Sequence, residues 1–265
     1  MPLGAWRRAI DSTTSSTESA RLRQPQPLIR SRLPSGRGAM EQPNATGDGD
    51  VPLTARFWLT LVLAGVATGL FGMAMMFVLF SVEHLAFGYH SGSFEAGVEH
   101  ASSLRRVSAV TIGGLVGGAA WYLLRRFTPG EKSEVDDTIW SGDGHLSFRR
   151  SLGTSLISEV AVGMGGSLGR EAAPKLIGGA AASVLADWTG LSEGQRRLVV
   201  ACAAGAGLAA VYNVPLGGAI FTAEVLIGSI TLPVILPAVV CSGIATGVAW
   251  AYLPTSATYV DIPQY

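Results

Sequence analysis

Residues 169–174 read Gly169-Arg170-Glu171-Ala172-Ala173-Pro174, a glycine-led turn that predicts the start of a helix at Gly169. The residues that follow it, from Lys175 to Trp188, are mostly Ala, Gly, Leu, Ile and Val. The first N–H groups of a helix have no partner inside the helix and carry partial positive charge. At membrane depth and next to a cavity, such an end binds anions. Glu171 lies in the first turn, so its carboxylate can take the place of a free anion until a proton neutralises it.

The same turn has a plainer interpretation, because acidic residues are common in the first turns of helices. An ionisable group at membrane depth, however, is usually functional. The apolar residues on both sides of Glu171 therefore favour an ion site over a simple helix cap.

The composition is that of an integral membrane protein. Of the 265 residues 48% are hydrophobic and 14% are charged, whereas about a quarter of the residues of a soluble domain are charged. The formal net charge is zero, so nothing favours a nucleic-acid partner. Cys202 and Cys241 fall in apolar helical runs and read as core residues. The histidines lack metal-ligand spacing, and we predict neither a metal site nor a cofactor.

The N-terminal residues 1–52 are rich in Ser, Thr, Pro, Arg and Gly, and we expect a disordered basic tail. No apolar run follows the early arginines, so the segment is not a secretory signal. Positive charge favours the cytoplasmic side. We therefore expect a cytoplasmic N-terminus and a location in the plasma membrane.

Four apolar segments predict transmembrane or membrane-buried helices: 57–82, 107–124, 148–167 and 232–253. A helix needs about 20 apolar residues to cross about 30 Å of hydrocarbon. Glycines in the first two segments predict close helix contacts. Glu159, inside the third segment, is expected near an interface or a cavity. The polar segment 84–104 is predicted to be a loop outside the cytoplasm, and 128–149 a short helix and a loop.

Between residues 191 and 228 the pattern predicts a broken helix. Ser192 and Gln195 fit a capping box that starts a helix over 193–211. Asn213-Val214-Pro215 interrupts the pattern, and Pro215 begins a new helix that runs to about Gly228. Broken helices occur in membranes only where protein or a cavity surrounds them.

Three pieces between residues 163 and 225 resemble the chloride channel (CLC) family of anion channels and chloride/proton exchangers. Residues 169–174 are similar to its GREGP-type segment, and residues 203–218 to its GAAAGLAAAFNAPLAG stretch. Residues 221–225, Phe-Thr-Ala-Glu-Val, are similar to its FxxEE or FxxEV run. The resemblance covers about residues 54–253. It implies an all-α fold: a polytopic membrane protein that forms the N-terminal half of a CLC pore, with tilted and broken transmembrane helices.

The resemblance implies roles for individual residues. Glu171 would be the gating glutamate, and the backbone amides of Gly169, Arg170 and Ala172 would face the anion. Glu224 matches an acid that lies next to the family's internal proton acceptor. At the acceptor position itself this chain has Val225, which carries no proton, so the residues favour channel-like conduction, or exchange by another proton route.

Two local departures accompany the resemblance. The family's GSGIP-type segment, which supplies a serine hydroxyl to the central anion, should precede Glu171 by about forty residues. The window from Phe127 to Glu134 has no such motif, and Ser133 is the only nearby serine. Ala172 also replaces the glycine that follows the glutamate, and its methyl group is expected to shift the backbone or to narrow the site.

The family is built from two halves of opposite topology that meet at the anion. This chain matches the first half: we expect a transmembrane half-domain over 53–253 and a loop remnant over 254–265. Either the chain is a fragment, or it pairs with a second half or with another copy as a homodimer. The expected substrate is chloride or another small anion, in a lipid bilayer.

Three hypotheses follow: gated chloride transport, a non-conducting membrane protein without the second half of the pore, and chloride/proton antiport. An intramembrane serine enzyme is disfavoured. Ser167 and Ser183 lie in apolar surroundings, but no histidine follows His145. We therefore expect no enzyme activity.

Overall fold

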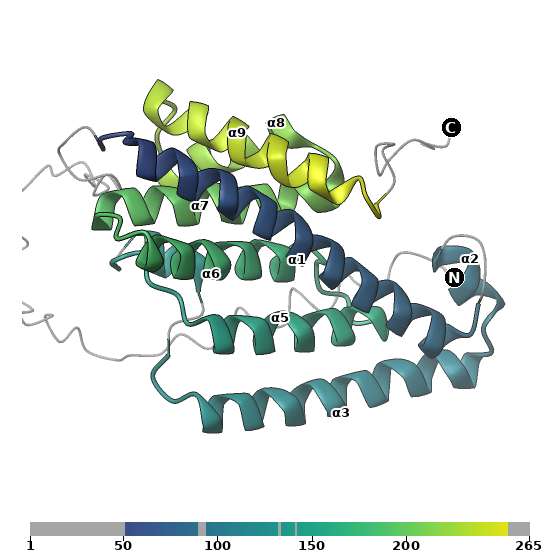
Figure 1. The fold of residues 1–265 in the computed structure, drawn as a ribbon. Helices are drawn as coiled ribbons and strands as arrows, with labels where there is room; N and C mark the ends of the chain where they lie inside the picture. Colours follow the sequence, from purple (N-terminus) through teal and green to yellow (C-terminus); the bar gives the residue numbers. More distant parts are fainter. Residues whose placement is uncertain (1–50, 90–93, 132–133, 141, 254–265) are drawn as a thin grey trace, which may run out of the picture. The chain divides into compact units, whose positions relative to one another are not determined.

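The computed structural model describes residues 51–89, 94–131, 134–140 and 142–253. The secondary-structure elements of these residues are all helical (Figure 1). They are α1 (Ala55–Phe87), α2 (Phe94–His100), α3 (Ser103–Phe127), α4 (Val135–Trp140), α5 (Phe148–Gly163), α6 (Ala172–Trp188), α7 (Glu193–Tyr212), α8 (Pro215–Phe221), η1 (Thr222–Ile227) and α9 (Leu232–Ala249). The predicted all-α fold class is confirmed. The predicted tail over 1–52 and remnant over 254–265 lie almost wholly outside the described residues.

Helix α7 forms the centre of the bundle, and its small side chains are almost all buried. Helices α6, α9 and α1 pack against it, and α5 packs between α6 and the outlying α3 (Figure 1). Within the described part of the chain, α1, α3 and α9 are long and apolar enough to cross a membrane. Helix α5 ends at Gly163, four residues earlier than predicted, because Gly165 turns the chain with a positive φ of 94°.

Glycines allow the helices to approach closely, as predicted for α1. A Cβ atom on Gly69 would lie 2.7 Å from the carbonyl oxygen of Ala245 in α9, a distance that real Cβ atoms do not adopt. On α3, by contrast, the glycines do not all pack tightly: Gly113 meets Met164, while Gly114 and Gly118 face open space.

The predicted break near residue 213 is present. Ser192 and Gln195 form the capping box of α7, and Asn213 ends that helix in the left-handed conformation with a φ of 56°. Pro215 is the first residue of α8, which passes into the π-helical turn η1 and ends at Gly228. The prediction of a loop over 84–104 is wrong in part, because α1 continues to Phe87 and α2 lies within this segment. The amphipathic run that forms α2 is too short to stand out in the sequence.

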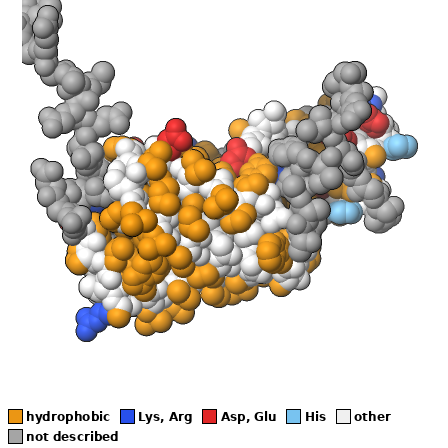
Figure 2. Space-filling view, turned by 90° about the horizontal axis from the view of Figure 1, so that it is seen from above, with side chains coloured by type: hydrophobic (Ala, Val, Ile, Leu, Met, Phe, Trp, Pro, Cys, Tyr) orange, Lys and Arg blue, Asp and Glu red, His pale blue; other side chains and the backbone are white. Residues whose placement is uncertain are grey.

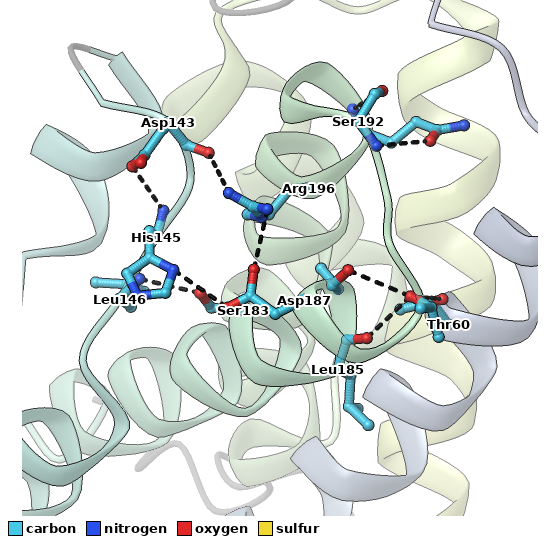
Figure 3. Close-up of polar contacts among 12 residues, drawn as sticks. Thr60, Asp143, His145, Leu146, Ser183, Leu185, Asp187, Ser192 and Arg196 are labelled. Carbon is cyan, nitrogen blue, oxygen red and sulfur yellow. Dashed lines mark hydrogen bonds and ion pairs between the residues drawn. The ribbon is translucent and has the colours of Figure 1, made fainter.

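A polar cluster joins the loop before α5 to α6 and α7 (Figure 3). Asp187 forms an ion pair with Arg196, with 2.9 Å between Oδ1 and the guanidinium nitrogen. Its other oxygen, Oδ2, lies 3.2 Å from His145 Nδ1. Inside the bundle, the backbone N–H of Leu146 donates to Ser183 Oγ at 3.0 Å. These contacts fix the end of α6 that lies opposite Glu171.

The face formed by α8, η1 and α9 is apolar and open. Figure 2, which views the molecule from above Figure 1, shows hydrophobic side chains across this side. The exposed large apolar residues there are Leu216, Ile220, Val225, Ile230, Leu232 and Leu236.

Candidate functional site

The predicted turn is present, but α6 begins at Ala172 and not at Gly169. The first helical hydrogen bond runs from Lys175 N to the Glu171 carbonyl at 3.3 Å. Pro174 therefore lies in the first turn, where its missing N–H removes no helical hydrogen bond. Glu171 becomes the N-cap residue, and its side chain makes no capping bond.

The backbone amides of the turn are available to a ligand. Among the described residues, the N–H groups of Gly169, Arg170 and Ala172 donate no hydrogen bond to the protein. Gly169 and Ala172 are exposed. With the orphan donors of the helix end, these groups concentrate partial positive charge at one surface point. The exposed position of Ala172 gives no sign of the narrowing that we expected from its methyl group.

The carboxylate of Glu171 folds back toward Gly169, the first residue of this turn. Its oxygens occupy the space that a Cβ atom on Gly169 would need, so a side chain at residue 169 would displace the carboxylate from this position. The Tyr212 hydroxyl donates to Glu171 Oε2 at 3.1 Å. The carboxylate therefore lies where an incoming anion would meet the unpaired amides.

Tyr212 also contacts the side chain of Arg170. The guanidinium carbon of Arg170 lies 5.0 Å from the centre of the Tyr212 ring, a cation–π distance. Sequence reasoning missed this role of Tyr212. The one available signal was a substitution: this chain has tyrosine where the family's AFNAPLAG stretch has phenylalanine. The tyrosine adds a hydroxyl group beside Asn213.

Gly207 of helix α7 packs against the first turn of α6. A Cβ atom at this position would clash with the backbone of Pro174. The backbones of α6 and α7 are therefore in direct contact at the first turn of α6. This contact sets the height of the helix end relative to Tyr212, five residues farther along α7.

A surface pocket of about 700 Å³ lies next to the turn. The loop after α5 and Arg170 form one wall, and the end of α1 with Tyr89 forms another. Tyr89 donates to Glu83 Oε2 at 3.3 Å, and its ring stacks on His84 at 4.3 Å. Burial, with the adjacent Glu83 carboxylate, raises the pKa of the Tyr89 hydroxyl to about 12, so Tyr89 remains a hydrogen-bond donor at neutral pH.

Glu224 and Val225 lie on a different element, η1, and both are exposed. Within the described residues, Glu224 forms no hydrogen bond or ion pair with the turn before α6. The structure therefore does not bring these two predicted residues together with Glu171.

Ser133 lies outside the described residues. A different polar pair occupies this region: Lys175 Nζ lies 3.4 Å from Asp136 Oδ2 of α4 and 5.9 Å from the centre of the Phe221 ring. Lys175 follows Glu171 by four residues, so both side chains lie on one face of α6. The sequence showed Lys175 only as the start of an apolar run.

Glu159 is completely buried in α5. Neither of its carboxyl oxygens has a hydrogen-bond partner among the described residues. Its position in an apolar helix predicted a cavity or interface nearby, but no sequence pattern indicated that its carboxyl group lacks a partner among the described residues.

The remaining polar candidates have structural surroundings. The Ser183 hydroxyl accepts a hydrogen bond from the Leu146 N–H. Cys202 and Cys241 are buried free thiols. No group of three potential metal-ligating side chains occurs in the described part of the chain.

Comparison with known proteins matches residues 113–263, more than half of the chain, to the family model described as voltage gated chloride channel. The voltage-gated ClC-type chloride channel ClcB of Yersinia pestis is 31% identical over 184 residues, which are 68% of this chain and 44% of the relative. ClcB of Citrobacter koseri is 33% identical over 186 residues, 68% of this chain and 43% of the relative. ClcB of Escherichia coli O9:H4 is 35% identical over 187 residues, with the same shares. The match thus spans less than half the length of these relatives.

Proposed function

The chain belongs to the voltage-gated chloride channel family, and from this premise we propose that it forms part of an anion pathway in which Glu171 is the gate. It is an integral membrane protein with several spans, and the family consists of channels and transporters, not enzymes. The proposed substrate is chloride or another small anion.

The observation that carries the proposal is the position of the Glu171 carboxylate beside Gly169, in a turn with unpaired backbone amides. Such donors replace part of an ion's hydration shell and select by the sign of the charge. The ionised carboxylate competes with the anion for them. Protonation, or rotation away from Tyr212, removes this competition and admits the anion.

The gate faces one defined side of the membrane in this proposal. The pocket beside Arg170 is also lined by Glu83, His84 and Tyr89 at the far end of α1. A cytoplasmic N-terminus places this end of α1 outside the cytoplasm. Glu171 would then control entry from the outside of a plasma membrane.

The pathway also needs a partner surface, because anion sites of this architecture use helix ends from two halves. The apolar face of α8, η1 and α9 is the surface that a second half of the pore, or a second copy in a homodimer, would cover.

Chloride efflux from liposomes tests the proposal directly. The purified chain, reconstituted in lipid, is expected to release chloride into a chloride-free bath faster than protein-free liposomes. Release at the protein-free rate would support the alternative of a non-conducting chain. Proton movement driven by a chloride gradient in the same liposomes would support the antiporter, against the expectation from Val225.

A further inference from the structure

Glu159 is the buried ionisable group that the proposed gate does not use. Its side chain has no exposed surface, and neither carboxyl oxygen has a partner among the described residues. Burying an ionised carboxylate without hydrogen bonds or a counter-ion costs a large free energy, so such a group is normally held as the neutral acid. A glutamate with a purely structural role would have partners here.

The backbone directs Glu159 toward the start of α6. Ser155 precedes it by four residues and therefore shares its face of α5. The Ser155 hydroxyl donates to the Ala173 carbonyl in the first turn of α6 at 3.1 Å. Glu159 lies one helical turn farther along the α5–α6 contact, next to the loop residues that include Glu171.

The charged groups that act on Glu159 come from two elements. Arg170 and Glu171 belong to the turn before α6, and Glu83 belongs to α1. The arginines of α3, which also packs on α5, lie at the two ends of that helix. Three carboxyl groups thus share one guanidinium group. Like charges that lie this close disfavour one another's ionised forms, so a proton on one carboxyl group relieves repulsion within the set.

The pocket borders this set. Glu83 and Arg170 line it, and so does Val162, which lies one turn after Glu159 on the same side of α5. Glu83 belongs both to this set and to the pocket lining, and it therefore connects the two.

We propose that Glu159 is a second proton-binding residue of the gate, which stores a proton beside Glu171 and exchanges it with the pocket. This inference rests on the proposed function, since it assigns the regulation of the same site. A hydronium ion in the pocket gives its proton to the Glu159 carboxylate and leaves water. The O–H bond of Glu159 then breaks as the proton passes to the Glu171 carboxylate, which leaves Glu159 ionised and the gate neutral.

Infrared difference spectra of the purified chain in lipid, recorded across a pH titration, test the inference without any need for conduction. We expect a carbonyl band from a buried protonated acid that is lost in Glu159→Gln and retained in Glu159→Asp. The exposed acid Glu134 provides the matched control, and Glu134→Gln should keep the band. Retention of the whole band in Glu159→Gln would overturn the proposal.

Coupling to the gate is measured in the same spectra with Glu159 unchanged. Glu171→Gln removes one member of the set, so the midpoint at which the Glu159 band appears should shift. An unmoved midpoint would overturn the relay even if Glu159→Gln failed to fold. Chloride efflux then separates the two proposals: a wild-type chain that shows the coupled band but no efflux retains the proton site and contradicts the transport function. Where efflux occurs, Glu159→Gln should flatten its pH dependence.

Discussion

The hydroxyl of Tyr212 lies 3.1 Å from Oε2 of Glu171 and donates a hydrogen bond to it. This bond joins the end of α7 to the N-cap of α6, and it holds the carboxylate beside Gly169 of the turn. Among the described residues it is the one side-chain hydrogen bond of Glu171, the residue that we propose as the gate.

Tyr212→Phe is therefore expected to favour the open gate. A hydrogen bond to a charged group contributes about 1.5–3 kcal/mol, so its loss should raise the fraction of open gates by roughly tenfold or more. Chloride efflux at neutral pH measures this change. Tyr122→Phe is the control, because Tyr122 is exposed on α3. An equal efflux rate in both variants would exclude Tyr212 from the gate.

Gly207→Ala is expected to destabilise the site from below. The added methyl group would meet the Pro174 backbone, and overpacking of this kind costs about 1–3 kcal/mol. The midpoint of thermal unfolding in detergent should fall. Gly114→Ala is the matched control on α3, where a Cβ atom meets nothing within 4 Å, and it should leave the midpoint unchanged or raise it. A similar midpoint for both variants would contradict the close α6–α7 contact.

Some of this organisation was predictable because it depends on neighbouring residues. The capping box of Ser192 and Gln195, the break at Asn213 and the start of α8 at Pro215 each depend on side chains within a few positions. The three long apolar helices followed from hydropathy and length.

Other parts depend on contacts between distant segments and were not predictable. Helix α6 starts at Ala172, three residues later than the glycine-led turn predicted, and its first turn lies against Gly207 of α7, a contact that the local sequence does not show. The partnership of Tyr212 with Glu171 joins residues 41 positions apart. The lack of a hydrogen-bond partner for Glu159 among the described residues depends on how α1, α5 and α6 pack together, and this packing cannot be read from neighbouring residues.

Ser183→Ala should destabilise the fold at the end of α6 far from the gate. It leaves the buried N–H of Leu146 without its acceptor, at a cost of about 1–3 kcal/mol. Ser242→Ala is the control, because the Ser242 hydroxyl is buried with no hydrogen-bond partner among the residues that the structure describes, and its removal should be neutral or stabilising. Thermal unfolding of the two variants should differ in this order. The reverse order would contradict the packing in Figure 3.

Lys175→Met is expected to slow chloride efflux with little change in stability. The ion pair with Asp136 is partly exposed, and such pairs contribute about 0–1 kcal/mol. The lost positive charge, in contrast, lies on the Glu171 face of α6. Lys175→Arg keeps the charge and should conduct like the wild type. If Lys175→Met conducted equally well, Lys175 would have no part in the pathway.

The dependence of chloride efflux on external pH in Glu171→Gln tests the gate most directly. Glutamine has the shape of the protonated side chain and cannot ionise. Wild-type efflux should rise as the external solution is acidified, whereas efflux through Glu171→Gln should be high and independent of pH. A variant that kept the wild-type pH dependence would contradict the assignment of Glu171 as the gate.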